Sequence, residues 1–327
     1  MKGVTGVATG PIAGTDRGEL PGAVLLNGVP VELVPSAEAS RAPLESHSRT
    51  LDARPLLLDR GLHFGDGLFE TIACMGGRPR FLEDHLRRLA HGCQRLAIAA
   101  PPLELQAEIE SLAAGCDRGL VKVLYTRGPA TARGYAPSGE EYPTRIVLRY
   151  PWPHEDARWA SQGVAVQIAA LTLGENPRLA GLKHLNRLEL VLARAELAAS
   201  HCLEALLLTS SGQLVSGTMS NVFLVHGGRI ETPRLDRCGV AGVMRRVVMR
   251  VAAESGLAVE EMSLKQVDLD SAQEIFLTNA RIGIWPVRAV QSRTLVPGPV
   301  TRRLQGLIEP LLENAAPVRP AAGATAS

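Results

Sequence analysis

The chain has 327 residues, of which 46% are hydrophobic, and its formal net charge at pH 7 is +2. This length and apolar content allow a large core and favour two domains of ordinary size. The charges are nearly balanced and form no run of five or more of one sign, which argues against binding to nucleic acid or to an anionic membrane. A small molecule is therefore the expected partner.

The five cysteines show no C-x-x-C or other metal-ligand spacing, so we expect a reducing compartment and a cytoplasmic protein. Near the N-terminus, Gly, Thr, Pro and charged residues interrupt any apolar run, which predicts no signal peptide, and no segment has the apolar length of a membrane span. Residues 1–21 and 314–327 are rich in Ala, Gly, Pro and Thr and are predicted to be disordered.

A smaller α+β domain is expected over residues 22–150. Strands are predicted at AVLLNG from Ala23, at 68–75, at 120–125 and at 144–150. Helices are predicted from about Leu82, where apolar residues keep helical spacing, and after the proline pair 101–102. Residues 28–56 form a long polar insertion to which the sequence gives no role.

The prolines of segment 151–154 predict a linker, placed at residues 151–160. A larger α+β domain is expected over residues 161–313. Its predicted strands are 163–170, 204–209, 221–225, 257–263 and 273–278, and its predicted helices are 184–199, 241–254 and a last one from about Pro299. Because strands outnumber helices and do not alternate with them, an α+β fold is expected rather than a doubly wound sheet.

One lysine stands out in segment 179–187. Lys183 lies between a loop of small residues and the predicted helix, in which Leu185, Leu188 and Leu192 share a face. A lysine held in a cleft loses part of its affinity for a proton, and the neutral amine can attack a carbonyl group. Spacing alone favours an ordinary lysine near a helix start with its head in solvent, which is the commoner case.

Two other segments have features of phosphate sites. His85 and Arg88 lie three residues apart on one face of a predicted helix, where a guanidinium group can hold an anion, but a solvated helix surface has the same pattern. Segment 232–245 runs from a strand end through a glycine turn into a helix, which directs backbone N–H groups at one point. A tight turn that simply needs glycine is an equal alternative.

Together these segments resemble the fold-type IV enzymes that use pyridoxal phosphate (PLP), a group that includes branched-chain and D-amino-acid aminotransferases and aminodeoxychorismate lyases. The resemblance covers residues 55–313. It rests on DRG at 59–61, FGDGLFET at 64–71, DHLRR at 84–88, SNVF at 220–223 and the turn at 239–245. KHLNR at 183–187 and RGY at 133–135 are similar to the lyases in particular. The resemblance implies a two-domain α+β homodimer that converts 4-amino-4-deoxychorismate to 4-aminobenzoate and pyruvate.

The resemblance also implies roles for single residues. Lys183 would carry PLP and act as the base, and Thr71 would relay a proton, although strand packing accounts for Thr71 equally well. The cofactor would contact Arg88, Ser216, Asn279 and the backbone N–H groups of Val243 and Met244. The substrate would contact Arg133, Tyr135 and Asn279.

Two features depart from the group. The loop between Asn27 and Leu57 is longer than usual, and Ser216 stands where the group usually has a glutamate against the PLP ring nitrogen. Two rival functions stay open: an aminotransferase of the same fold that acts on D- or branched-chain amino acids, and a cofactor-binding protein without catalysis, which the missing glutamate would allow. The presence of both Lys183 and Arg133 argues against the second.

Overall fold

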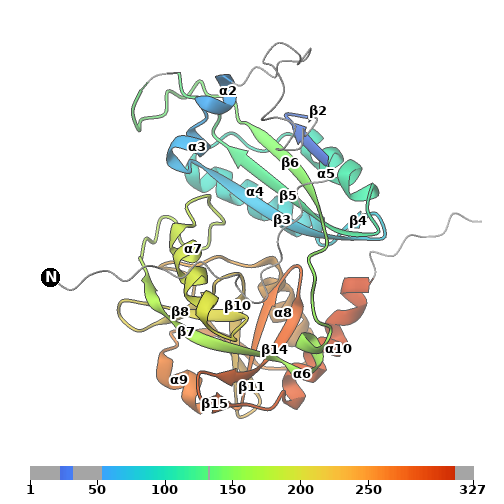
Figure 1. Cartoon of the computed structure of the whole chain (residues 1–327), viewed down its shortest axis with the longest axis vertical. Coiled ribbons are helices and arrows are strands. Elements are labelled where there is room, and N and C mark those ends of the chain that lie inside the picture. Colours follow the sequence, from blue (N-terminus) through green and yellow to red (C-terminus); the bar gives the residue numbers. More distant parts are fainter. Residues whose placement is uncertain (1–22, 32–53, 132, 314–327) are drawn as a thin grey trace, which may run out of the picture.

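The computed structural model describes residues 23–31, 54–131 and 133–313 (Figure 1). The two predictions of disorder lie outside these residues, as does most of the insertion 28–56. In the described chain, strands before residue 152 form one β-sheet and strands after residue 163 form another, with helices packed on both. The predicted α+β class is confirmed.

The strands before residue 152 form the upper sheet, which lies at the top of Figure 1. It has six strands within the described residues, in the order β2-β1-β6-β5-β3-β4, and each pair of adjacent strands is antiparallel. The strands are β1 (Ala23–Leu26), β2 (Val29–Val31), β3 (Gly67–Met75), β4 (Arg78–Pro79), β5 (Arg118–Thr126) and β6 (Arg145–Pro151). The helices are α2 (Arg54–Leu57), α3 (Arg60–Phe64), α4 (Leu82–Leu96) and α5 (Glu104–Ala114).

Helix α4 forms because one side of it is apolar, as the sequence predicts. Its residues Leu89 and Cys93 are buried against Leu68 and Ile72 of β3. Glu83 and Asp84 in the first turn and Arg95 in the last match the charges of the helix ends. The position of α4 over β3 matters because the two elements together supply one wall of the site.

The lower sheet has nine strands in the part of the chain that the structure describes, eight of them in the order β12-β11-β10-β13-β14-β7-β8-β9, with β15 paired to β14. The strands are β7 (Val164–Leu173), β8 (Glu204–Thr209), β9 (Leu214–Gly217), β10 (Asn221–His226), β11 (Arg229–Pro233), β12 (Val259–Met262), β13 (Glu274–Asn279), β14 (Gly283–Val290) and β15 (Arg293–Thr294).

The helices of this part are α6 (Arg158–Gln162), α7 (Leu188–Ala195) with a 3₁₀ turn at Glu196–Ala199, α8 (Val243–Glu254), α9 (Gln266–Ser271) and α10 (Pro299–Glu313). Helix α8 buries Met244 and Val248 in a core that includes the stacked rings of Phe223 and Phe276, whose centroids are 4.8 Å apart. This packing fixes the start of α8. Among the described helices, none is both long and apolar enough to cross a membrane.

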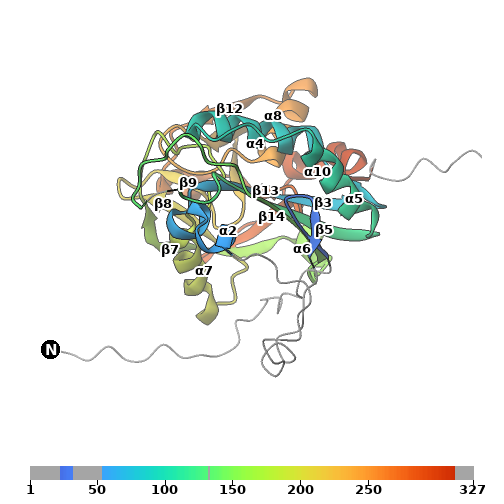
Figure 2. The same ribbon diagram turned by 90° about the horizontal axis from the view of Figure 1, so that it is seen from above.

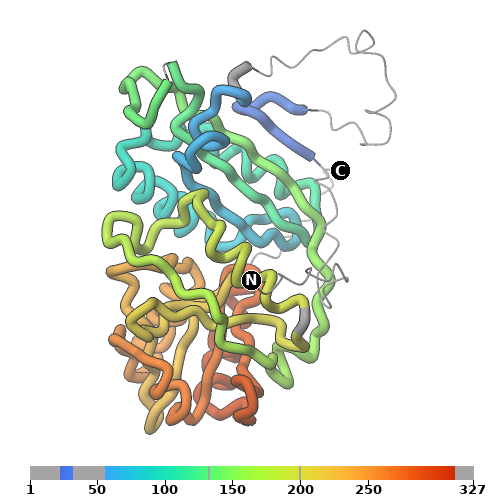
Figure 3. The backbone as a smooth tube through the Cα atoms, turned by 60° about the vertical axis from the view of Figure 1, so that its left-hand side comes forward, coloured from blue at the N-terminus to red at the C-terminus, as the bar shows by residue number. Residues whose placement is uncertain are grey.

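The helix predicted over 184–199 is wrong at its start, because α7 begins only at Leu188. Residues before it are held in an extended form by β3: Phe69 N–H donates to the Lys183 carbonyl at 2.9 Å, and Leu185 N–H donates to the Gly67 carbonyl at 3.0 Å. Leu185, Leu188 and Leu192 therefore do not share one buried helix face, and Leu188 is 70% exposed. The yellow-green segment before α7 lies between the upper and lower parts (Figure 3).

Candidate active site

A cavity of about 680 Å³ lies between the two parts of the chain. Phe69 and Thr71 of β3 and Arg88 of α4 line it on the upper side. The lower side is formed by the loops 216–221 and 238–243 and by the end of β13. The segment 183–187 also lines the cavity, so the lysine predicted to be functional does lie in a cleft.

Lys183 is held there by the packing of its own side chain and of the residue before it. Its ammonium nitrogen lies 4.1 Å from the centre of the Phe69 ring, and the preceding Leu182 is 3% exposed in the core of the upper sheet. Burial, with the nearby charge of Arg88, lowers the pKa of Lys183 to about 7. A large fraction of this amine is therefore neutral near pH 7, as attack on a carbonyl requires.

Arg88 is fixed by a buried carboxylate on the neighbouring strand. Its Nε and Nη2 donate to the two oxygens of Glu70 at 2.8 and 2.5 Å. Burial alone would raise the pKa of Glu70, but the charge and hydrogen bonds of Arg88 outweigh it and lower the pKa to about 2. His85 Nδ1 lies 2.7 Å from Glu70, and because Glu70 is ionised, this nitrogen carries the proton. The guanidinium group is thus held in one orientation.

The start of α8 lies next to the Arg88 guanidinium group. Arg88 Nη1 donates to the Ala241 carbonyl at 3.0 Å, and α4 and α8 lie on the same side of the molecule (Figure 2). Gly242 caps α8 without a side-chain bond, so the N–H groups of Val243 and Met244 have no partner within the helix. A Cβ on Gly242 would lie 2.0 Å from Asn221 Oδ1, which explains why the turn needs glycine there.

These residues fit a cofactor that carries a phosphate and an aldehyde. Arg88 and the free N–H groups of α8 provide a cation and a helix N-terminus for the phosphate. Lys183 provides an amine whose pKa of about 7 suits carbonyl chemistry. PLP has both groups, and the described residues around the cavity are compatible with it.

The sequence matches the profile of the family Amino-transferase class IV over residues 67–290. The chain belongs to the class IV aminotransferase family. The match begins at β3 and ends at the end of β14, so it includes the whole wall described above. The family resemblance seen in the sequence is confirmed.

Three known proteins show which members of the class IV aminotransferase family this chain is similar to. The crystal structure of 4-amino-4-deoxychorismate lyase from Pseudomonas aeruginosa has 40% sequence identity and a TM-score of 0.77, covering 88% of this chain and 98% of that one. An aminodeoxychorismate lyase of Vibrio harveyi is 33% identical over 76% of this chain and 93% of its own length. A D-alanine aminotransferase of Bacillus licheniformis is 27% identical over 77% of this chain and 89% of its own.

Several residues predicted for the site line the cavity. Besides Lys183 and Arg88, these are Thr71, Ser216, Val243 and Asn279. The Ser216 hydroxyl donates to the Gly217 carbonyl at 2.9 Å, and Asn279 Nδ2 donates to the Met219 carbonyl at 3.0 Å. The Met244 side chain packs in the core beneath α8, so only its backbone faces the turn.

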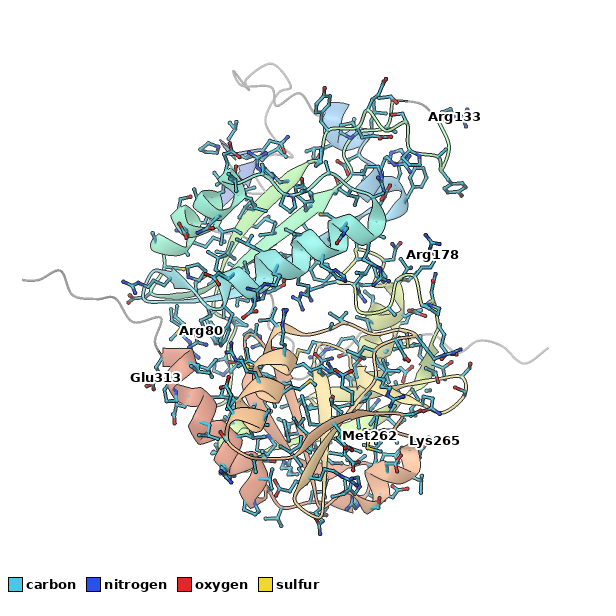
Figure 4. All side chains as sticks on the ribbon, turned by 180° about the vertical axis from the view of Figure 1, so that it is seen from behind. Arg80, Arg133, Arg178, Met262, Lys265 and Glu313 are labelled. Carbon is cyan, nitrogen blue, oxygen red and sulfur yellow. The ribbon has the colours of Figure 1, made fainter. Side chains whose placement is uncertain are left out.

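Arg133 and Tyr135 are not brought into the cavity of their own chain. Both lie in the exposed loop between β5 and β6, where Tyr135 is 83% exposed. The Tyr135 carbonyl accepts a hydrogen bond of 2.6 Å from Arg60 Nη2. The centroid of the Tyr135 ring lies 5.2 Å from that of the Phe64 ring. Figure 4 shows Arg133 at the outer edge of the upper part.

Sequence reasoning missed two residues of this class IV site. Glu70, which fixes Arg88, stands in the apolar strand pattern LFETIACM, where a lone acidic residue could have indicated a buried ion pair. Arg187 lines the cavity beside Lys183. It was noted only as the last residue of KHLNR, and no sequence pattern distinguished its side chain from those of the exposed arginines nearby.

Proposed function

We propose that this protein is a PLP-dependent lyase that converts 4-amino-4-deoxychorismate to 4-aminobenzoate and pyruvate. The observation that carries the proposal is the position of Lys183, with a pKa of about 7, in a cavity shared with the anion site of Arg88 and α8. The choice of reaction within the family is supported by the lyases of Pseudomonas aeruginosa and Vibrio harveyi.

The side chains have distinct tasks in this reaction. When bound, PLP supplies an electron-withdrawing ring that stabilises negative charge at the amine-bearing carbon of the substrate. Arg88 and the start of α8 hold the phosphate end. Lys183 Nζ then takes the proton from the amine-bearing ring carbon. The C–O bond at the adjacent ring carbon breaks, and enolpyruvate leaves with the bonding electrons. The Thr71 hydroxyl, also in the cavity, can pass a proton to the carbon that becomes the methyl group of pyruvate.

The direct test is to incubate the holoenzyme with 4-amino-4-deoxychorismate and to measure 4-aminobenzoate and pyruvate in equal amounts. The main alternative is an aminotransferase of the same fold, which the D-alanine aminotransferase of Bacillus licheniformis supports. Addition of D-alanine or a branched-chain amino acid separates the two proposals, because an aminotransferase would convert the bound cofactor to its amine form. Conversion at a rate that exceeds elimination would overturn the lyase proposal.

Ser216→Glu is expected to raise transamination relative to elimination. By the family resemblance, Ser216 faces the ring nitrogen of PLP, where a carboxylate would hold a proton far more firmly than a hydroxyl already bonded to Gly217. Transamination depends more on that proton, because elimination is driven by loss of the leaving group and by aromatisation. Assays with D-alanine and aminodeoxychorismate give the ratio of the two rates, with Ser216→Ala as the control. An unchanged ratio would refute this role.

We also propose that the protein is a homodimer in which the partner completes the site. A substrate role for Arg133 requires a second copy, because the loop of this residue is bound to Arg60 and lies outside its own cavity. Helices α3 and α7 lie on the same side of the molecule (Figures 1 and 2), and large apolar side chains of both remain exposed. They include Leu62, Leu188 and Val191, which are 71%, 70% and 59% exposed. A second copy would cover this face.

Mixed dimers provide the test of this arrangement. Arg133→Ala alone is expected to lower kcat/KM while the cofactor spectrum stays normal, and Lys183→Ala alone to be inactive. If the Arg133 of one subunit serves the Lys183 of the other, refolding the two variants together should restore activity to roughly a quarter of the wild-type level, since half of the dimers then contain one complete site. Absence of any recovery in a mixture shown to contain mixed dimers would contradict the proposal.

The cytoplasm is the location that we propose. All five cysteines are unpaired in the structure, which is the state expected in a reducing compartment. Localisation of the tagged full-length chain by fractionation would test this directly.

A further inference from the structure

Among the described residues, three arginines line the cavity: Arg88, Arg187 and Arg281. Two of them have a carboxylate partner, since Arg88 pairs with Glu70 and Arg281 pairs with Glu155. Arg187 differs from both, because no carboxylate of the described chain lies within ion-pair distance of its guanidinium group. It is thus a cation of the cavity wall with no carboxylate in ion-pair contact, and Glu189 acts on its charge only from beyond that distance.

The contacts of Arg187 show which part of it is available. Its Nε donates to the His184 carbonyl at 2.8 Å and its Nη2 donates to the Leu182 carbonyl at 2.6 Å. Both acceptors are neutral, and both lie on one edge of the guanidinium group. The remaining three donors, two on Nη1 and one on Nη2, have no hydrogen-bond partner in the described chain and can serve a ligand in the cavity.

The environment of Arg187 favours an anion. The side chain is partly buried, and burial together with the charge of Arg88 lowers the pKa of Arg187 to about 10. A guanidinium group in such a place is stabilised when a carboxylate bonds to it, because charge-assisted hydrogen bonds offset the loss of hydration. Arg88 is not free to take a substrate carboxylate, because it is held by Glu70 and by the turn before α8 and is assigned above to the phosphate end of the cofactor.

The position of Arg187 relative to Lys183 limits the kind of ligand that could bind both residues. The guanidinium carbon lies 6.0 Å from the centre of the Phe69 ring, and Lys183 Nζ lies 4.1 Å from the same centre. The two cationic groups therefore stand at the same aromatic ring. A flat ligand with an amine at one end and a carboxylate at the other could extend between them along Phe69.

We propose that Arg187 binds the ring carboxylate of the substrate, the one that lies opposite the reacting amine and is retained in 4-aminobenzoate. This inference rests on the proposed lyase function and assigns one of the two substrate carboxylates to a residue of the same chain that carries Lys183. The other carboxylate leaves with pyruvate and remains for Arg133 of the partner subunit. Arg187 is then the residue that selects a carboxylated ring over a plain aromatic amine.

The test compares two ligands that differ only in this carboxylate, 4-aminobenzoate and aniline, by calorimetric titration of the holoenzyme. Wild type should bind 4-aminobenzoate about 10- to 100-fold more tightly than aniline, the range expected for a charge-assisted hydrogen bond. In Arg187→Gln the two affinities should become similar. Arg178→Gln is the matched control, because Arg178 is exposed beside the cavity without lining it (Figure 4), and it should keep the wild-type ratio.

Arg187 also holds the carbonyls on both sides of Lys183, so the cofactor absorbance spectrum must be recorded for each variant. Arg187→Lys keeps the charge and separates the two roles: it should retain part of the preference that Arg187→Gln loses. The proposal is overturned if wild type does not prefer 4-aminobenzoate, if Arg187→Gln keeps the preference, or if both variants lose it together with the normal spectrum. Turnover of aminodeoxychorismate is measured separately, so a preference without turnover would refute the lyase and not the carboxylate site.

Discussion

Lys183→Ala is expected to abolish lyase activity, with a loss of about 10³-fold or more, since this residue both binds the cofactor covalently and moves the proton. Borohydride reduction of the wild-type holoenzyme followed by peptide mapping should place the pyridoxyl group on Lys183. Lys122→Ala is the matched control, because Lys122 Nζ is also near the Phe69 ring, at 5.8 Å, yet does not line the cavity. A label on Lys122 or Lys265 would show that the assignment is wrong.

The same lysine predicts a pH dependence. Below its pKa of about 7 the amine is mostly protonated and cannot attack an aldehyde, whereas above it the amine is mostly neutral. The rate at which the apoprotein takes up PLP should therefore rise about tenfold per pH unit up to about pH 7 and then level off. Stopped-flow absorbance measures this rate. A rise that continued to pH 10 would indicate a lysine with an ordinary pKa.

Arg88→Ala is the second change with a large expected effect, and it should reduce both cofactor affinity and stability. Loss of the phosphate contact should weaken PLP binding by about one to two orders of magnitude. Removal of Arg88 also leaves Glu70, which is 2% exposed, as a buried charge with His85 as its remaining partner. Breaking a buried pair in this way costs about 3–5 kcal/mol. Thermal unfolding of the apoprotein should record this as a lower Tm.

Two controls separate these effects. Glu70→Gln in the Arg88→Ala background removes the unpaired charge, so it should recover much of the lost stability while PLP binding stays weak. Arg87→Ala tests for general effects of a charge on α4, because Arg87 is 62% exposed and pairs with Asp84. Its stability should stay within about 0.5 kcal/mol of wild type. Unchanged PLP affinity in Arg88→Ala would refute the phosphate role.

The pKa of Glu70 gives the sign of a related acid effect. Its folded-state pKa of about 2 lies below its ordinary value, so the ionised form stabilises the fold. That contribution is fully present above the ordinary pKa of a glutamate, about 4.3, and is lost as the pH falls toward 2.

The sequence predicts the helices and strands whose apolar pattern is local. Helices α4 and α8 begin within two residues of their expected positions, since each has a continuous apolar face. Strand β14 was missed, because Pro286 interrupts a pattern that otherwise resembles a strand. In the fold Pro286 lies opposite Phe276 of β13, and only the completed sheet determines that pairing.

The site was predictable where a residue type is tied to its neighbours in sequence, as for Lys183, Arg88 and the Gly239–Gly242 turn. It was not predictable where partners come from distant elements. The bond between Arg88 and Glu70 joins a helix to a strand 18 residues away. The start of α7 was misplaced for a similar reason, since β3 holds the residues before it and local helix propensity cannot describe such a contact.

The segment around Lys183 is hydrogen-bonded to the upper sheet and to the turn before α8 in the lower part. Gly181 exchanges bonds of 3.0 Å with Gly239 and Ala241 of the lower part, and two residues later Lys183 and Leu185 bond to β3 of the upper part. A ligand in the cavity therefore touches residues whose positions depend on both the upper and the lower part, so unfolding of either part releases it. Saturation at 100 times Kd adds about 2.7 kcal/mol to the free energy of unfolding. This linkage applies to both halves at once, which makes the cofactor a source of cooperativity that joins them into one unfolding unit.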